Sequence, residues 1–344
     1  MTHRATGETS SRGTRPVFPE VAAEDIRRVR STIISWFDSA ARDLPWRAPG
    51  TSAWAILVSE IMSQQTPVSR VAPRWQEWME TWPTPADLAK APTAEVLRRW
   101  DRLGYPRRAL RLQEAARAIS EELDDEVPEL AEELERLPGI GSYTAAAVAS
   151  FANGQRTTVL DTNVRRVLIR LFAGQERPTA SPGRAETRWA AQFVPEVDHV
   201  KWNAGVMEFG ALVCTARNPS CGQCPLQDMC AWNRLGRPAS ATKPKTQKWA
   251  GTDRQLRGAI MDVLKAAHEE AEGTDSDAVC IDLFTASTTR IDPELLDALG
   301  TATSAKLGTM RDLSTDAERV SRLIADLVTD GLAHRRGELL SLPR

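Results

Sequence analysis

The sequence predicts a mainly α-helical protein with a smaller module at its C-terminal end. Apolar residues recur at helical spacing in most segments between residues 23 and 213. A stretch rich in Pro, Lys and Thr at 238–250 then separates this part from the rest. Only residues 331–340 look like short strands, around an Arg-Gly turn. With 344 residues the chain is long enough for two or three domains.

These features give four expected parts. Residues 1–20 are rich in Thr, Ser, Arg and Gly and lack the apolar centre of a signal peptide, so we expect a disordered tail. A helical core over 21–235, a linker over 236–250 and a C-terminal domain over 251–344 follow. Helices ahead of a hairpin suggest a winged-helix-like fold for the last part. Its only local hint of DNA contact is the run 334–336 (His-Arg-Arg), which a solvated turn explains equally well.

Bulk charge does not indicate a nucleic-acid-binding protein. The net charge is −2 and the pI is about 6.2, so any DNA-binding surface must be local. No apolar run approaches the length of a membrane span, and we therefore expect no membrane partner.

The first predicted helix covers Ala23–Ala41, and the second, Ala53–Gln64, is apolar nearly all round and so should be buried. Glu60 lies within the second helix. A buried carboxylate is costly unless paired or protonated, and burial should raise its pKa, as a general acid near pH 7 requires. The alternative is an exposed glutamate on a narrow polar stripe with Ser59 and Ser63.

Four more helices are predicted before residue 138, and their tryptophans are expected in the core: Val68–Trp82, Thr93–Leu103, Arg107–Leu123 and Leu130–Leu137. The turn Leu103–Pro106 presents the aromatic residue Tyr105. Six arginines between residues 98 and 111 form the densest basic patch. A solvated helix face explains this patch, but the few acids nearby favour phosphate contact.

A tight turn at Leu137–Gly141 leads into a predicted helix over Ser142–Phe151. Gly139 and Gly141 allow a close backbone approach, and the helix start offers free N–H groups, so a phosphate oxygen could bind here. The turn could also simply join two helices. Further on, Asp161 and Asn163 open another helix, where Asp161 could be a plain N-cap.

Four of the five cysteines fall within seventeen residues: Cys214, Cys221, Cys224 and Cys230. An odd total with such clustering indicates a reduced, intracellular protein with a metal site rather than a disulfide framework. Four thiolates suit either a tetrahedral zinc or an iron–sulfur cube, and their spacing does not separate the two. Cys280 is isolated and is expected to be a small apolar residue.

The motifs together resemble the helix-hairpin-helix DNA glycosylases of the endonuclease III superfamily, in particular MutY-type adenine DNA glycosylases. The resemblance covers roughly residues 21–235. It rests on the four-cysteine spacing and on six motifs in family order: LPWR at 44–47, SEIMSQQT at 59–66, LGY at 103–105, LPGIGSYTA at 137–145, LDTNVRRVL at 160–168 and MEFGALVC at 207–214. It implies a two-lobed glycosylase core, base excision repair activity and a 4Fe–4S cluster on the cysteines.

The resemblance also implies residue roles. Glu60 would protonate N7 of a flipped adenine, and Asp161 would stabilise the oxocarbenium-like sugar or briefly bond to it. Tyr143 and Asn163 would position these acids and the water. The remaining expected roles are an adenine pocket at Arg47 and Glu208, a duplex wedge at Gln65 and Tyr105, and phosphate binding at Gly139 and Gly141.

Position 143 separates members of the superfamily. Bifunctional relatives carry a lysine there that attacks the sugar and leads to strand cleavage, whereas Tyr143 cannot form a Schiff base. The resemblance therefore implies a monofunctional enzyme that acts on double-stranded DNA with adenine opposite 8-oxoguanine or guanine. We expect a monomer in the bacterial cytoplasm, at the nucleoid.

The C-terminal part departs from the family pattern, because many members end in a Nudix-like domain that reads 8-oxoguanine and none is recognisable here. Two alternatives remain open. One is a thymine or uracil mismatch glycosylase of the same superfamily, which Glu60 disfavours because a pyrimidine has no N7. The other is a non-catalytic iron–sulfur protein that binds DNA or senses redox state, which leaves Glu60 and Asp161 without a purpose.

Overall fold

The computed structural model describes residues 18–179, 181–240, 249–271, 277–285, 295–296, 298–314 and 316–344. Most of the tail expected over 1–20, and the central part of the linker expected over 236–250, lie outside these residues. The chain divides into two compact units: Met1–Arg42 with Thr158–Ala241, and Asp43–Thr157 with Thr242–Arg344.

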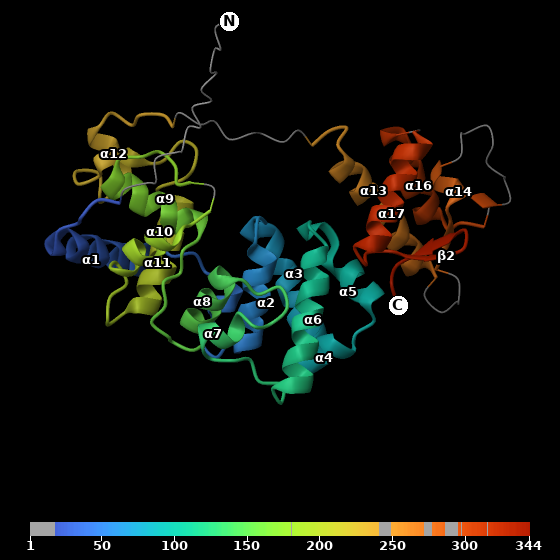
Figure 1. The fold of residues 1–344 in the computed structure, drawn as a ribbon, viewed down its shortest axis with the longest axis horizontal. Helices are drawn as coiled ribbons and strands as arrows, with labels where there is room; N and C mark the ends of the chain where they lie inside the picture. The colour runs from blue at the N-terminus through green and yellow to red at the C-terminus, as the bar shows by residue number, and fades with distance from the viewer. Residues whose placement is uncertain are drawn as a thin grey trace, which may run out of the picture. The chain divides into compact units, whose positions relative to one another are not determined.

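The first unit is helical (Figure 1). It combines two stretches of the chain, one before residue 43 and one after residue 157. Its elements are α1 (Ala23–Ala40), α9 (Thr162–Leu168), a π-helical turn η3 (Ile169–Ala173), α10 (Arg184–Ala191), α11 (His199–Leu212), the 3₁₀ turn η4 (Cys221–Gln223) and α12 (Ala231–Arg234). Helix α11 packs against both α1 and α9. Trp202 and Phe209 of α11 and Ile33 of α1 are among its fully buried side chains.

The second unit begins with seven helices and two short 3₁₀ turns: η1 (Pro45–Arg47), α2 (Ala53–Ser63), α3 (Val68–Thr81), α4 (Pro85–Lys90), α5 (Thr93–Trp100), η2 (Asp101–Leu103), α6 (Arg107–Glu122), α7 (Ala131–Leu134) and α8 (Ser142–Phe151). Trp75 and Trp78 are buried in its core, which confirms their expected placement. Helix α4 is not anticipated by periodicity because six residues are too few to show it. It is fixed instead by a capping box between Thr84 and Asp87.

The C-terminal residues of the second unit form further helices and a small sheet: α13 (Asp253–Glu270), β1 (Val279–Cys280), α14 (Asp282–Thr285), α16 (Thr301–Leu313), α17 (Ala317–Thr329), β2 (His334–Arg336) and β3 (Leu339–Ser341). Strand β3 lies between β1 and β2 and pairs antiparallel with both. The expected hairpin is confirmed. Strand β1 and helix α16 were not expected, because residues 275–308 show little periodicity.

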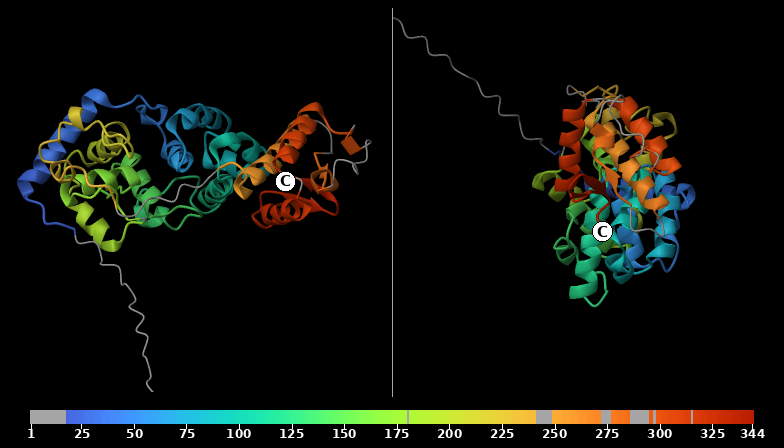
Figure 2. Two further views of the ribbon diagram at one scale, coloured as in Figure 1. Left: turned by 90° about the horizontal axis from the view of Figure 1, so that it is seen from above. Right: turned by 90° about the vertical axis from the view of Figure 1, so that its right-hand side faces the viewer.

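These C-terminal elements share an apolar core with residues 43–157. Helix α13 packs against α5, and it lies beside the α5–α6 segment in both figures (Figures 1 and 2). Buried side chains thus join the module expected beyond the linker to this part of the chain. Within the part of the chain described here, no helix combines the length and apolarity needed to cross a membrane.

Candidate active site and cysteine loop

Glu60 lies in the second unit, on the buried helix α2, with 9% of its surface exposed. Helix α8 packs against α2, and Tyr143 at its start donates a hydrogen bond from Oη to Glu60 Oε2 at 2.9 Å. Ser59 is also buried, so the alternative of an exposed polar stripe is wrong. A carboxyl group in this apolar helix is therefore held in a defined orientation by a neutral hydroxyl donor.

The turn before α8 contains two glycines with different constraints. Gly139 has φ +75°, and a Cβ there would lie 2.6 Å from Arg111 Cβ, so only glycine fits. Gly141 is the N-cap of α8, and a Cβ there would meet no atom within 4 Å. The space beside Gly141 is thus open, which leaves room for an incoming phosphate oxygen at the helix start.

A pocket of about 230 Å³ beside this turn is lined by Pro138, Gly139 and Ile140 together with three arginines, Arg107, Arg108 and Arg111. This end of the basic patch suits a phosphate. Acidic partners occur at both ends of the patch: Arg98 and Arg99 pair with Glu95 at 2.7 and 2.5 Å, Arg111 pairs with Glu114 at 2.7 Å and Arg107 with Asp330 at 3.3 Å. Phosphate contact by this patch stays a prediction.

The two expected wedge residues both have left-handed backbones, with φ of 55° at Gln65 and 48° at Tyr105. Strain of this kind persists only where the surrounding structure enforces it. The residue that contacts both loops is Arg108, which the sequence places in the basic patch but not in this role.

Arg108 ties the two wedge loops together with five hydrogen bonds. Its Nη1 donates to the carbonyls of Ile61 and Met62 at 2.6 and 3.2 Å. Its Nη2 donates to Thr66 Oγ1 at 3.1 Å and to the carbonyls of Leu103 and Gly104, both at 3.0 Å. Burial lowers the pKa of Arg108 to about 10, which still leaves the guanidinium charged at pH 7.

In the first unit, Asp161 is the N-cap of α9: its Oδ1 accepts from Val164 N at 2.6 Å. Its Oδ2 accepts from Asn163 Nδ2 at 2.7 Å. Burial raises the pKa of Asp161, while these two donors and Arg166 act to lower it. The N-cap interpretation is thus confirmed, but it leaves a desolvated carboxylate at a helix start, which suits stabilisation of positive charge.

Two residues that sequence reasoning missed hold Asn163. Arg166 donates from Nη2 to Asn163 Oδ1 at 2.8 Å and from Nε to the Cys214 carbonyl at 2.7 Å. Gly210 of α11 lies so close that a Cβ there would be 2.7 Å from Asn163 Cβ. Only the glycine in the MEFGALVC motif could have signalled this contact.

Glu208, also on α11, is buried and forms an ion pair with the partly exposed Arg42. Arg42 Nε and Nη2 lie 2.6 and 2.9 Å from the two carboxylate oxygens, and Arg42 N donates to Oε1 at 3.0 Å. The pKa of Arg42 is raised by this hydrogen-bonded carboxylate. The expected role of Glu208, lining an adenine pocket together with Arg47, stays a prediction. Arg47 belongs to the other unit, in η1.

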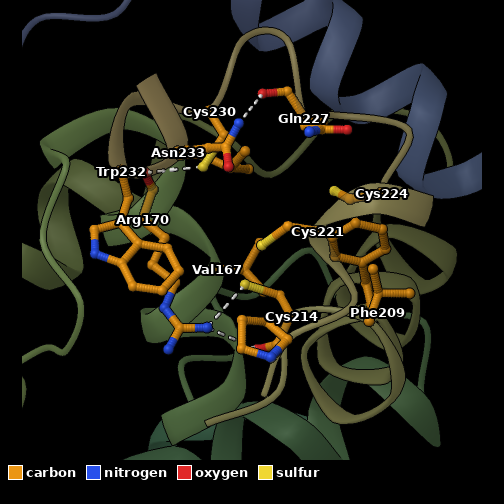
Figure 3. A pocket seen from close by; sticks show the side chains of 13 residues that line it. Val167, Arg170, Phe209, Cys214, Cys221, Cys224, Gln227, Cys230, Trp232 and Asn233 are labelled. Atoms are coloured by element: carbon orange, nitrogen blue, oxygen red, sulfur yellow. Dashed lines mark hydrogen bonds between the residues drawn. The ribbon is translucent and has the colours of Figure 1, made fainter. Parts of the chain in front are cut away.

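The four cysteines line one pocket with Val167, Arg170, Phe209 and Trp232 (Figure 3). Arg170 is 1% exposed, stacks on the Trp232 ring at 4.3 Å and points Nη1 at Cys214 Sγ from 3.5 Å. A buried guanidinium needs negative charge nearby, and ligated thiolates supply it.

The four cysteines lie close enough together to line a single pocket. Their four sulfur donors fit either metal candidate, a tetrahedral zinc or an iron–sulfur cluster. Burial raises the pKa of the Cys224 thiol to about 11, so metal ligation is what would deprotonate it.

Comparison with known families and relatives agrees with this geometry. Residues 58–192 match the HhH-GPD superfamily base excision DNA repair proteins, and residues 214–230 match the iron–sulfur binding domain of endonuclease III. An adenine DNA glycosylase of Mycolicibacterium smegmatis is 53% identical over 233 residues, covering 68% of this chain and 79% of the relative. One from Mycobacterium tuberculosis is 44% identical over 290 residues, covering 83% and 95%.

The rat adenine DNA glycosylase is 42% identical over 239 residues, but the match covers only 46% of its length. Among solved structures, a thermostable thymine-DNA glycosylase superposes with a TM-score of 0.57 at 28% identity, covering 62% of this chain and 98% of that one. A non-covalent endonuclease III–DNA complex gives 0.55 at 24% identity, covering 63% and 99%, and supports the fold alone.

Proposed function

The chain belongs to the adenine DNA glycosylase family of base excision repair, and from this premise we propose that it removes adenine mispaired with 8-oxoguanine or guanine. As a family member it binds DNA and hydrolyses the N-glycosyl bond between adenine and deoxyribose. Residues 214–230 hold its 4Fe–4S cluster, on Cys214, Cys221, Cys224 and Cys230.

In the proposed reaction the adenine leaves the stack and enters the site, because the scissile bond cannot be reached inside the duplex. Glu60 protonates N7, which makes the base a better leaving group. Asp161 stabilises the oxocarbenium-like sugar or bonds to it briefly, and water then completes the hydrolysis. Tyr143 orients Glu60, and Asn163 orients Asp161 and the water.

The observation that carries this proposal is the hydrogen bond between Tyr143 and Glu60. It places a neutral phenol beside the acid, at the position where bifunctional relatives have an amine. Without an amine, no Schiff base forms with the sugar, and the opened site remains an intact abasic strand. The enzyme is therefore monofunctional in this proposal.

In this proposal, the turn before α8 and the two loops that carry Gln65 and Tyr105 bind the duplex. The backbone at Gly139 and Gly141 takes a DNA phosphate, and the pocket arginines neutralise its charge. Gln65 and Tyr105 enter the base stack vacated by the adenine. Arg47 and Glu208 line the adenine pocket, and Glu208 also holds Arg42 by hydrogen bonds. The cluster, when bound, supplies the fold of the cysteine loop for backbone contact.

One lesion offers one scissile bond, so the protein acts as a monomer in this proposal. Its substrate is chromosomal DNA, which places it at the bacterial nucleoid. The C-terminal elements form a winged-helix-like domain, supported by the order α13–β1–α14–α16–α17–β2–β3 and by a sheet with β3 between β1 and β2.

The solved thymine-DNA glycosylase raises a second candidate, removal of thymine opposite guanine. Its 28% identity is well below the 53% and 44% of the adenine enzymes. Glu60 is buried and hydrogen-bonded at the position of the proposed acid, and a pyrimidine offers it no N7. An adenine substrate therefore explains the presence of Glu60, which a thymine substrate does not.

Replacing each carboxylate tests the proposal. We expect Asp161→Asn and Glu60→Gln each to slow adenine release by roughly a hundredfold or more, the scale of losing a group that stabilises transition-state charge. Single-turnover release from a duplex with adenine opposite 8-oxoguanine measures the rate. Duplex affinity and the circular-dichroism spectrum control for folding. Wild-type rates in either variant would refute the assigned chemistry.

A further inference from the structure

The C-terminal segment contacts Tyr105, the aromatic residue proposed to enter the duplex. Arg254, at the start of α13, places its guanidinium 4.4 Å from the centre of the Tyr105 ring and 5.3 Å from that of Trp249. Tyr105 is 41% exposed and Trp249 is 55% exposed, and Arg254 is exposed as well. Three planar groups thus form a stack that faces solvent.

An exposed stack of this kind contributes little to the stability of the fold. A cation over an aromatic ring at an exposed site contributes only about 0.5–1 kcal/mol, so it adds little to folding. Exposed aromatic rings and arginine planes are, however, the groups on which nucleobases stack. Tyr105 also has a strained backbone, φ 48°, which is enforced from its other side by Arg108.

The segment that carries Arg254 is anchored to its own helices. Thr252 caps α13 by accepting from Gln255 N, and its hydroxyl donates to the Trp249 carbonyl at 2.8 Å. The Gly251 carbonyl accepts from Arg319 Nη2 of α17 at 2.9 Å. Trp249 and Arg254 are therefore presented by a fixed turn.

Helix α13 is in turn anchored beside the Tyr105 turn. Lys265 Nζ, which is buried, donates to the Asp101 carbonyl at 3.2 Å, four residues before Tyr105. Asp330 at the end of α17 pairs with Arg257 of α13 and also with Arg107, at 3.3 Å, two residues after Tyr105. Helix α13 is thus held by contacts to residues before and after Tyr105 in the sequence. These contacts bring Arg254 next to the Tyr105 ring.

We infer that Arg254 is a positioning residue for Tyr105, and that Trp249, Arg254 and Tyr105 form one DNA-contacting surface to which the C-terminal segment contributes. This inference rests on the proposed function. The guanidinium plane keeps the Tyr105 ring oriented for entry into the duplex, so its loss should affect extrusion of a stacked adenine more than cleavage of the glycosyl bond.

The test compares two duplexes in single-turnover assays, one with adenine opposite guanine and one with adenine opposite an abasic-site analogue, where extrusion costs less. We expect Arg254→Ala to slow release from the first by about 2- to 5-fold, the scale of an exposed cation–π contact. The second duplex should be affected less. Lys306→Ala, which removes an exposed cation from α16 of the same segment, is the matched control and should match wild type.

Two further variants make the inference specific. In a Tyr105→Ala background, Arg254→Ala should have no additional effect, since coupled residues are non-additive. Arg254→Lys keeps the charge without the plane and should behave like Arg254→Ala. Wild-type rates for Arg254→Ala, additive effects with Tyr105→Ala, or full rescue by lysine would each overturn the inference. If the wild-type protein releases adenine from neither duplex, the proposed function fails instead.

Discussion

Asp161 serves two purposes with one side chain. Its Oδ1 caps helix α9, and its Oδ2 is held by Asn163. The cap fixes the carboxylate where the helix dipole favours negative charge, while burial works against ionisation. The same hydrogen bonds that build the helix start therefore also set the protonation state of the proposed catalytic group.

This balance predicts the acidic side of the pH profile. Burial raises the pKa of Asp161, and only the carboxylate stabilises a cationic sugar, so the rate should fall with decreasing pH at values above those of an ordinary aspartate. Asn163→Ala removes a donor that lowers this pKa and should move the acidic limb to higher pH. Single-turnover rates from pH 4 to 8 (roughly the range in which a raised carboxyl titrates) measure it.

The control for this prediction is Asn153→Ala, which changes an asparagine of the other unit, on the segment after α8. Its acidic limb should coincide with that of the wild type. An unshifted limb in Asn163→Ala, or a shift to lower pH, would contradict the assigned role of Asp161.

Sequence patterns predict some site residues and not others. Glu60 stands out because it interrupts an apolar helix, and the cysteines because four thiols cluster within seventeen residues. Arg42 and Gly210 do not stand out, and Arg108 stands out only as a member of the basic patch. Arg42 meets Glu208 across 166 residues, and Arg108 meets Ile61 across 47. Contacts between distant segments leave no local pattern, so only the folded chain reveals them.

At the scale of elements, the turn before α8 must pack against α6 and must also leave the start of α8 accessible. A different glycine meets each of these two requirements. Gly139 serves the packing of the turn against α6, since its Cβ would collide with Arg111 Cβ at 2.6 Å. Gly141 serves access to the helix start, where an added Cβ would meet no atom of the protein. Sequence alone treats the two glycines as equivalent, because both belong to one motif.

The two glycines therefore predict opposite phenotypes. Gly139→Ala should lower the free energy of unfolding by about 1–3 kcal/mol, because it combines backbone strain with a steric clash. Gly141→Ala should leave stability unchanged to within about 0.5 kcal/mol but weaken duplex binding, since its methyl group occupies the phosphate approach. Urea unfolding and DNA-binding titrations separate the effects. Equal loss of stability in both variants would show that the turn is only a structural joint.

Most helices follow from their periodicity to within a few residues, because their buried faces repeat at 3.6 residues. Thr93–Leu103 ends earlier than expected, at Trp100, because Asp101 has φ 43° and the chain continues as the 3₁₀ turn η2. The segment Leu130–Leu137 contains only the single turn Ala131–Leu134 as α-helix. Such endings depend on capping and packing, which the hydrophobic pattern does not encode.

At the scale of the molecule, the chain places its proposed functional parts in two units. The first contains Asp161 and the cysteine loop, and the second contains Glu60, the phosphate turn and the wedge residues. Within the first unit, Arg166 connects Asn163 to the Cys214 carbonyl, so the cysteine loop and the proposed catalytic aspartate share a hydrogen-bonded path. The sequence order predicts neither the division nor this connection.

Removing a cluster ligand should affect DNA binding beyond the loop itself. Cys224→Ser should lose the absorption near roughly 400 nm that iron–sulfur thiolates give. It should also weaken duplex affinity by about tenfold, the scale of losing several backbone contacts. Cys280→Ser is the matched control, because Cys280 lies in β1 of the other unit and should leave both unchanged. A colourless, zinc-loaded wild-type protein would contradict the cofactor assignment.

The most direct test of the account is single-turnover base release from duplexes with one central mismatch. The set comprises adenine opposite 8-oxoguanine, guanine and cytosine, and thymine and uracil opposite guanine, each read with and without alkali. We predict adenine release opposite 8-oxoguanine and guanine, with strand breaks only after alkali, because Tyr143 offers no amine. Release of thymine or uracil in place of adenine, or strand breaks without alkali, would contradict a monofunctional adenine glycosylase.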